Sequence, residues 1–189
     1  MPTGVALRDV RQQLFDAAER ILLRDGPSAL TSRAVTDEAG VAKGVLHKHF
    51  ADFDGFLADF VLDRFQQTAT GDLPELVGVG SVAENVTNAL TALFSSVALA
   101  IVPLVTFRDE LRTRLRETWP AGIPVLTDGA IMLGEYLAAE QRLGRVDAYA
   151  DPETLGAMLI GTAHLRFADR SAGPPTPEAV RTIVDSVLR

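Results

Sequence analysis

The stretch SRAVTDEAGVAKGVLHKHF, Ser32 to Phe50, decides the fold class of this chain of 189 residues. Thr31 precedes it as a predicted N-cap, and Gly40 separates two short segments of helical spacing, about 33–39 and 42–50. Two short helices joined by a glycine turn are typical of a helix-turn-helix module. The apolar residues that would fix the angle between the two helices are Val35, Ala39, Val41, Leu46 and Phe50.

The outer face of the second helix carries both lysines of the chain, although the formal net charge is −7. In a helix-turn-helix module this helix enters the major groove of DNA, where lysine and histidine reach phosphates or base edges and glycine permits close approach. Residues 1–65 carry 8 Lys/Arg and 10 Asp/Glu, so the position of the cations, rather than the net charge, indicates DNA binding. The residues expected on this face are Lys43, Gly44, Val45, His47, Lys48 and His49.

Two other interpretations of the same face carry less weight. Most surface lysines lie on solvated helix faces, but the surrounding helix-turn-helix pattern favours DNA contact here. His47 and His49 lie two residues apart, so their side chains point to different sides of a helix and no metal site is expected. The chain has no cysteine, which excludes disulfides, cysteine nucleophiles and thiolate metal sites.

The rest of the chain also shows helical periodicity, so the predicted fold is all-α. Asp25-Gly26-Pro27 ends a first amphipathic helix, and the phenylalanines of 53–65 lie on the apolar face of another. Five more helices are expected beyond residue 80. Two of them have clear starts, at Asp151-Pro152-Glu153 and at Thr176-Pro177-Glu178, where an N-cap precedes a proline. The sequence shows no strand-like alternation and no internal repeat.

The segment from Asn85 to Phe107 carries no charge, so hydropathy alone would mark it as a membrane span. Six Asn, Thr and Ser residues in its first half, and Pro103 near its end, favour a buried helix of a globular domain instead. Pro103 is expected to open the following charged helix. The chain does not begin with a basic segment and an apolar core, so we expect a cytoplasmic protein.

The sequence contains no catalytic or cofactor motif. His164 lies in the apolar stretch GTAHLRF, without the serine and acid pattern of a hydrolase. Gly78-Val79-Gly80 is too short for a phosphate-binding loop and follows no predicted strand. We therefore predict neither an enzyme nor a bound cofactor.

The longer stretch ALTSRAVTDEAGVAKGVLHKHFADFDGFL, Ala29 to Leu57, resembles the DNA-binding segment of the TetR family of bacterial transcriptional repressors. The resemblance covers about the first 65 residues by motif, and the remainder by length and helical character. It implies a three-helix DNA-binding module, residues 1–52, followed by a larger helical ligand-binding and dimerisation domain, residues 53–189. By position it implies phosphate contacts for Thr31 and Arg33, and groove contacts for Lys43, Gly44, Val45, His47 and His49.

Three residues depart from the pattern of the family. His47 stands in place of a tyrosine whose hydroxyl commonly binds a phosphate, and Ala42 in place of a serine that could cap the helix. Phe53 occupies the place of a lysine that usually contacts the DNA backbone. These departures predict weaker DNA binding, and Lys48, at a variable position, is expected to compensate in part.

The expected ligand site lies in the larger domain. Because no cationic side chain occurs between residues 85 and 107, we expect a neutral or weakly polar effector. The alternative is that the candidate side chains simply form the core. The candidate lining residues are Asn88, Thr91, Phe94, Phe107, Met132 and Tyr136.

The last two helices are the expected interface of a homodimer. One module reads too few base pairs for specificity, and a two-fold dimer suits a near-palindromic site. The alternative is that both apolar stripes pack inward on their own subunit. The candidate interface residues are Ala157, Gly161 and Leu165 on one helix, and Val180, Ile183, Val184 and Val187 on the other.

Together these expectations predict a ligand-responsive transcriptional regulator. It would be a homodimeric repressor that binds double-stranded operator DNA, is released by a small apolar effector, and has no membrane partner. The alternative is a helical small-molecule-binding or enzymatic protein whose DNA-binding module has decayed. Phe53, Ala42 and the acidic net charge are the evidence for that alternative.

Overall fold

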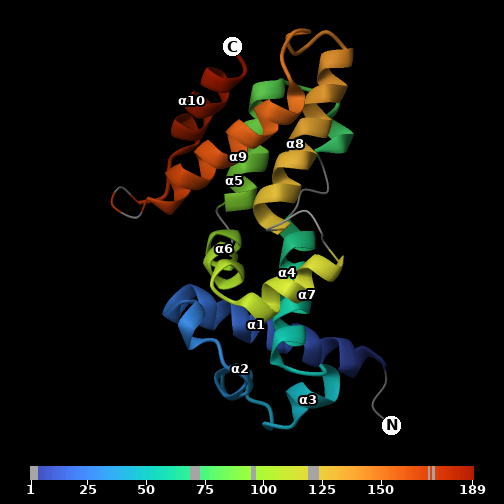
Figure 1. The fold of residues 1–189 in the computed structure, drawn as a ribbon, viewed down its shortest axis with the longest axis vertical. Coiled ribbons are helices and arrows are strands. Elements are labelled where there is room, and N and C mark those ends of the chain that lie inside the picture. Colours follow the sequence, from blue (N-terminus) through green and yellow to red (C-terminus); the bar gives the residue numbers. More distant parts are fainter. Residues whose placement is uncertain (1–3, 69–72, 95–96, 119–123, 170, 172) are drawn as a thin grey trace. The chain divides into compact units, whose positions relative to one another are not determined.

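The computed structural model describes residues 4–68, 73–94, 97–118, 124–169, 171 and 173–189. Throughout these residues the only regular elements are helices, which confirms the predicted all-α fold (Figure 1). Two short 3-10 turns are η1 (Pro27–Ala29) and η2 (Pro74–Leu76). The α-helices are α1 (Gly4–Asp25), α2 (Ser32–Glu38), α3 (Val45–His49), α4 (Phe53–Thr68), α5 (Val82–Phe94), α6 (Ala98–Thr106), α7 (Asp109–Thr118), α8 (Pro124–Arg142), α9 (Pro152–Ala168) and α10 (Pro177–Val187).

Capping residues fix several helix ends where the sequence predicts them. Gly26 follows α1 with a φ of 83°, a backbone conformation that favours glycine and lets the chain turn. Thr31 caps α2, because its Oγ1 accepts a hydrogen bond from the N–H of Ala34 at 3.1 Å. Thr176 caps α10 in the same way, through the N–H of Ala179 at 3.3 Å.

The charge-free segment differs from the prediction, because it forms two helices. Helix α5 ends at Phe94 and α6 begins at Ala98. Pro103 lies inside α6 and does not open the next helix, which begins at Asp109. The nine-residue helix α6 can contain Pro103, because the missing N–H of the proline costs the helix only one backbone hydrogen bond. The Pro103 carbonyl still accepts a hydrogen bond from the N–H of Phe107 at 3.0 Å. Six α-helices therefore follow residue 80 in the described part of the chain, instead of five.

The apolar side chains of α5 that face inward are buried within the protein. Among the described residues, no single helix is long and apolar enough to cross a membrane. Only together, as a bent pair, do α5 and α6 reach that length and composition.

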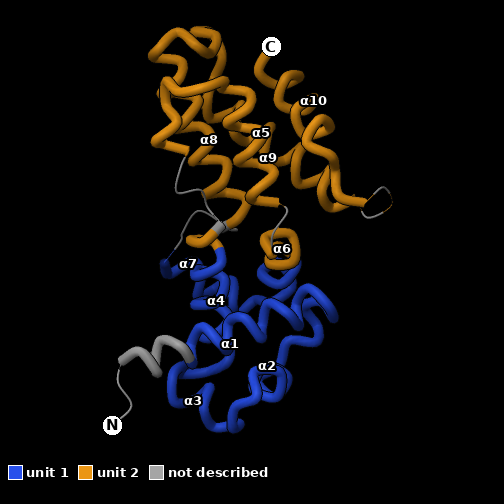
Figure 2. The backbone as a smooth tube through the Cα atoms, turned by 180° about the vertical axis from the view of Figure 1, so that it is seen from behind, with its two compact units in different colours: residues 1–64, 103–120 blue, residues 65–102, 121–189 orange. Residues whose placement is uncertain are grey.

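Two compact units make up the chain, and neither is one continuous segment (Figure 2). Unit 1 comprises residues 1–64 and 103–120, and unit 2 comprises residues 65–102 and 121–189. The boundary falls inside two helices, after Arg64 in α4 and after Val102 in α6. These units are defined by packing, so the functional boundary between residues 52 and 53 stays a prediction.

The core of unit 1 is built around Phe15 of α1. Helix α7 adds Leu111 and Leu115, both buried, although it lies far from the DNA-binding segment in the sequence. The core of this unit therefore needs more than the three helices that precede residue 53. The rings with centroids 5.6–6.1 Å from that of Phe15 are those of Phe50, Phe56 and Phe60.

Glycines let α8 and α9 approach closely in unit 2. A Cβ on Gly156 would lie 2.5 Å from the carbonyl oxygen of Ala130 and 2.8 Å from the backbone nitrogen of Gly134. A side chain at residue 156 would therefore push the two helix backbones apart. Helix α10 packs on α5 and α9 in the same unit, and its Val180 and Val184 are fully buried there.

Candidate nucleic-acid interface

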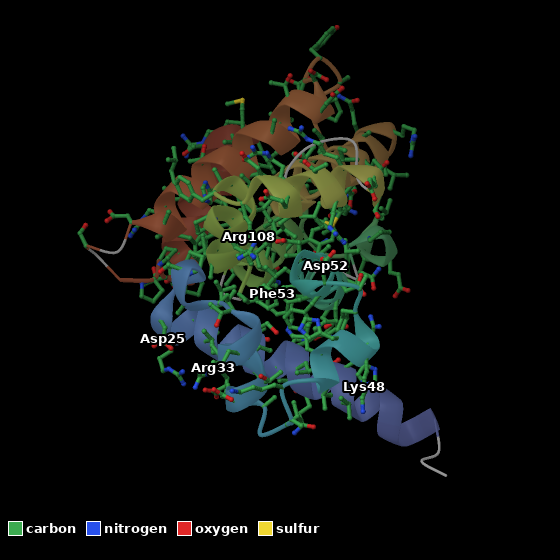
Figure 3. All side chains as sticks on the ribbon, turned by 60° about the horizontal axis from the view of Figure 1, so that its bottom comes forward. Asp25, Arg33, Lys48, Asp52, Phe53 and Arg108 are labelled. Atoms are coloured by element: carbon green, nitrogen blue, oxygen red, sulfur yellow. The ribbon has the colours of Figure 1, made fainter. Side chains whose placement is uncertain are left out.

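Helices α2 and α3 present one polar face to the outside of unit 1. Their apolar residues turn inward: Val35 and Leu46 are fully buried, and Phe50 is nearly so. Arg33 and Lys48, labelled in Figure 3, lie on the outward side. The predicted DNA-contacting residues that are exposed are Thr31, Arg33, Lys43, Gly44, His47 and Lys48, whereas Val45 and His49 are half-buried.

Lys43 and Gly44 lie in the turn that precedes α3, since this helix begins at Val45 and not near residue 42. Gly40 has a φ of 68°, so the turn between the two helices requires a glycine there. Gly44 has an ordinary φ of −77°, and a Cβ added to it would meet no atom within 4 Å. The fold itself therefore does not require a glycine at residue 44. A partner molecule that approaches the backbone closely would explain why a glycine occurs there.

The side chain of Thr31 keeps one hydrogen-bonding function free. Its Oγ1 already accepts from the N–H of Ala34 at 3.1 Å as the N-cap of α2. The hydroxyl group can still donate, and a DNA phosphate is an acceptor. Structure at the helix start is therefore compatible with the phosphate contact that the sequence predicts.

Arginines neutralise the acidic residues of unit 1. The Arg20 guanidinium holds the pKa of Glu38 below its ordinary value through a hydrogen bond of 2.8 Å, and Arg24 adds to this effect. In the described part of the chain, Lys43 and Lys48 form no ion pair, so their charges are available to an outside anion. The ion pairs of unit 1 are Arg11–Asp59, Arg20–Glu38, Arg24–Asp25, Arg24–Glu38, Arg33–Asp37, Arg108–Asp54, Arg112–Asp109, Arg114–Asp52, and Arg64 with Asp16, Glu19 and Asp63.

Within unit 1, helix α7 and the residue before it are tied to the start of α4. Asp52 caps α4 by accepting from the N–H of Gly55 at 2.8 Å, and its other oxygen pairs with Arg114. The Gly55 N–H and, to a lesser degree, the Arg114 charge hold the pKa of Asp52 below its ordinary value. The Nε of Arg108 donates to Asp54 at 2.6 Å.

Phe53 has a packing role in unit 1. Its ring stacks on that of Phe56 with centroids 5.6 Å apart, and the Arg108 guanidinium lies 5.2 Å from its centroid (Figure 3). This contact gives a physical reason for the residue that departs from the family's lysine. Arg108 and Arg114 were not among the predicted site residues, because no local signal in their charged stretch identifies their partners Asp54 and Asp52.

The predicted ligand-site residues fall in both units. Phe107 belongs to unit 1, where its side chain is 86% exposed, and Asn88 of unit 2 is also exposed. Thr91 is half-buried, and its hydroxyl donates to the Thr87 carbonyl of its own helix at 2.8 Å. Two of the six predicted residues, Asn88 and Phe107, are therefore exposed, and Phe107 belongs to a different unit from the other five.

Phe94 and Tyr136 are buried in unit 2, and Met132 is half-buried. The ring of Phe94 lies 6.0 Å from that of His164 and 5.6 Å from that of Phe167. The Nδ2 of Asn85 donates to the Tyr136 hydroxyl at 2.9 Å. Asn85, rather than Asn88, is thus the amide that meets Tyr136, and the ligand-lining role of these residues stays a prediction.

The predicted dimer residues divide into two groups. Ala157, Gly161 and Leu165 lie on an exposed face of α9, with the Leu165 residue 73% exposed. Val180 and Val184 of α10 are fully buried and pack inward on their own subunit. Ile183 and Val187 are half-buried. The available surface for a partner is therefore mainly that of α9.

The part of the chain that the structure describes contains no group of three or more His, Asp or Glu side chains that could hold a metal ion.

Comparison with known proteins gives matches to one group of regulators. Residues 14–59 match the family model of bacterial regulatory proteins, tetR family. The HTH-type transcriptional repressor KstR2 of Rhodococcus jostii (strain RHA1) is 30% identical over 125 residues, which cover 58% of this chain and 61% of that repressor. The chain thus spans less than two thirds of the repressor's length.

Solved structures match over nearly the whole chain. A TetR-family transcriptional regulator from Rhodococcus sp. has a TM-score of 0.72 at 18% identity, over 95% of this chain and 98% of the other. The regulator FadR from Bacillus subtilis, in complex with stearoyl-CoA, has a TM-score of 0.65 at 19% identity, over 94% and 95% of the two chains. These likenesses establish the fold.

Proposed function

We propose that this chain is a ligand-responsive transcriptional regulator of the TetR family, because its helix-turn-helix segment matches the family model and its fold matches that of a TetR-family regulator. It binds operator DNA as a homodimer and represses transcription until a small effector releases it. The observation that carries this proposal is the outer face of α2 and α3. There, the only two lysines of the chain remain unpaired within the described residues, while arginines neutralise the nearby acids.

We assign the DNA contacts as follows from exposure and chemistry. Thr31 and Arg33 bind phosphates, and Lys43, His47 and Lys48 face the major groove or its rim. Gly44 lets the backbone come close to the DNA, since its surroundings are open. Half-buried Val45 and His49 complete the groove-facing set, with smaller accessible surface.

The effector is a small molecule that binds within unit 2. This unit supplies buried apolar side chains from α5, α8 and α9, and few buried polar groups such as Asn85 and Tyr136, as ligand sites commonly do. The solved FadR structure contains stearoyl-CoA, a molecule with a long apolar chain, and this supports a mainly apolar effector here. Phe94, Met132, Tyr136 and Thr91 stay in the proposed lining set.

Helix α9 provides the dimer contact. Its exposed face carries Ala157, Gly161 and Leu165 together with Met158, which is also exposed, and these small and apolar side chains permit close helix approach. Half-buried Ile183 and Val187 of α10 can contribute at the edge. A two-fold pair of modules then matches a near-palindromic operator, and such a regulator acts in the cytoplasm without a membrane partner.

A gel-shift titration with the DNA that flanks the chain's own gene tests the proposal. The double variant Lys43→Ala/Lys48→Ala should bind more weakly than wild type, with the slope of log affinity against log salt reduced by about two. The matched control is Arg116→Ala/Arg142→Ala, which removes the same charge from exposed residues elsewhere. Equal loss in both variants would show that net charge, and not this face, governs binding.

The alternative, a helical binding protein or enzyme with a decayed DNA module, predicts a different result. The wild-type chain would then shift no more DNA at low salt than the Lys43→Ala/Lys48→Ala variant shifts. Phe53, the strongest sequence argument for decay, has a packing partner in Arg108, which weakens that argument. The gel shift decides between the two.

A further inference from the structure

Asp128 of α8 is a half-buried acid, one oxygen of which finds no partner among the described residues. Its Oδ2 is shielded from solvent and has no hydrogen-bond partner within the described part of the chain. Burial raises the pKa of its carboxyl group. An unpaired polar group in the interior lowers stability, and groups of this kind concentrate at functional sites.

The turn of α8 that carries Asp128 lies among apolar side chains of unit 2. A Cβ on the next residue, Gly129, would lie 3.0 Å from Cδ1 of Ile160 in α9 and 3.2 Å from Cδ2 of Leu93 in α5. Three helices therefore meet at this level of the unit. The Oδ2 atom of half-buried Asp128 is shielded from solvent, so a polar ligand group that reached it would gain a partner with little competition from water.

Asp128 also lies in line with the residues proposed to contact the effector. Asp128, Met132 and Tyr136 are spaced four residues apart, so they follow one another along one side of α8. Met132 is half-buried, and the hydroxyl of buried Tyr136 is held by Asn85 at 2.9 Å. The line therefore offers a charged acceptor at one end and an apolar surface beside it.

Glu140, one further turn along α8, shows what a structural acid looks like in this unit. It is fully buried, but Oε1 accepts from the N–H of Gly78 at 3.1 Å and Oε2 lies 3.1 Å from Nη1 of Arg145. Oε1 therefore has a hydrogen-bond donor, whereas Oε2 has an ion-pair partner but no hydrogen bond among the described residues. Within the same residues, Oδ2 of Asp128 has neither kind of partner.

We propose that Asp128 recognises the effector, by binding the ammonium or other hydrogen-bond-donating group of a molecule whose apolar body lies along Met132 and Tyr136. A charge-assisted hydrogen bond to Oδ2 supplies the partner that the protein lacks. This assignment rests on the proposed ligand-responsive function, and it specifies the chemical class of the effector: apolar, with a donor or cationic head.

Stability provides the first test. Asp128→Asn and Asp128→Leu should raise the Tm of the ligand-free protein at neutral pH, by about 2–4 °C, because they remove the charge from a carboxylate with a shielded, unpartnered oxygen. The matched control is Glu135→Gln, an exposed carboxylate on the same helix, whose Tm should stay close to that of wild type. A fall in Tm in both Asp128 variants would identify a structural acid and overturn the assignment.

Binding provides the second test, with octylamine, octan-1-ol and octanoate as probes that share one apolar body and differ in the head group. Calorimetric titration of the wild-type protein should show tighter binding of octylamine than of octanoate. Asp128→Asn should lower the affinity for octylamine at least about tenfold, which is the loss expected for one charged hydrogen bond. Glu135→Gln should leave this affinity unchanged. The assignment is overturned if wild type shows no preference for the amine, or if Asp128→Asn keeps that preference.

Operator binding by the wild-type chain separates the two proposals. If wild type shifts operator DNA but shows no preference for the amine, the assignment of Asp128 fails and the regulator stands. If the amine preference depends on Asp128 but no DNA is shifted, the regulator fails and the binding site stands.

Discussion

Asp37 is the acidic residue that competes for Arg33 on the proposed DNA-binding face. The Nε of Arg33 lies 3.5 Å from the carboxylate of Asp37, one turn further along α2, and both side chains are mostly exposed. An exposed pair of this kind adds little to stability. It does oppose DNA binding, since Arg33 must leave Asp37 to reach a phosphate and Asp37 repels the same phosphate.

Replacing Asp37 by Asn should therefore strengthen operator binding about threefold to tenfold, an effect on the order of 1 kcal/mol, and steepen its salt dependence. The matched control is Asp185→Asn, which removes the acid of a similarly spaced exposed pair, Arg181–Asp185, in α10. Fluorescence anisotropy with labelled operator measures both. No gain for Asp37→Asn over the control would place Arg33 away from the DNA.

Single residues of the α2–α3 segment were predictable because their signals are local. The N-cap Thr31, the turn glycine Gly40 and the buried Leu46 each follow from neighbours within a few residues. Asp128 could not be found in this way. Its significance lies in the absence of a partner in three dimensions, which no pattern in the sequence records.

At the scale of elements, the junction between α4 and α7 should depend on pH. Asp52 has a pKa below its ordinary value of 3.8, so its contribution to stability is complete above that pH and is lost as pH falls through the lowered pKa. Asp52→Asn should therefore lower Tm at pH 7, and the difference from wild type should shrink as pH falls below 3.8. A difference that stays constant across the titration would show that the charge of Asp52 is not involved.

The close contact of α8 with α9 gives a prediction with an internal control. Gly156→Ala should destabilise the protein by about 1–3 kcal/mol, because the new Cβ would meet helix backbone at 2.5 Å. Gly44→Ala, at a residue with an ordinary φ of −77° and nothing within 4 Å, should leave the free energy of unfolding unchanged or raise it by about 0.4–1 kcal/mol. Urea titration of both measures the contrast, and equal effects would contradict the close approach.

The elements themselves were predictable to different degrees. Helices with cap and proline signals, such as α9 and α10, begin where the sequence indicates. The division of the charge-free segment into α5 and α6 was not predicted, because a continuous apolar run has the same composition whether or not it bends. The partners of α7 escaped prediction as well, since Arg108 and Asp54 are 54 residues apart in the sequence.

At the scale of the whole molecule, the dimer is expected to depend on the exposed face of α9. Leu165→Glu should yield a monomer in analytical ultracentrifugation at micromolar concentration, because a charge would be buried in the interface. Tyr149→Glu, at the most exposed of the large apolar residues that the structure describes, should remain dimeric and serves as the control. A dimer in both variants would move the interface away from α9.

Effector binding and operator binding should oppose each other in the intact dimer. We expect a coupling free energy of about 1–3 kcal/mol, which weakens operator binding roughly 5–150-fold when effector is present. Linkage then requires operator DNA to weaken effector binding by the same factor. Titrating the effector with and without operator measures this, and equal effector affinity in both titrations would rule out a switch.

The discontinuous core of unit 1 affects how the protein is synthesised. The first 64 residues leave the ribosome well before Leu111 and Leu115, which are buried in the same unit. At about 5–20 residues per second, translation from residue 65 to residue 120 takes roughly 3–11 s. During this interval the nascent DNA-binding segment lacks part of its apolar core. We therefore expect a chain released at residue 65 to bind chaperones, whereas a chain released after residue 120 can complete this core.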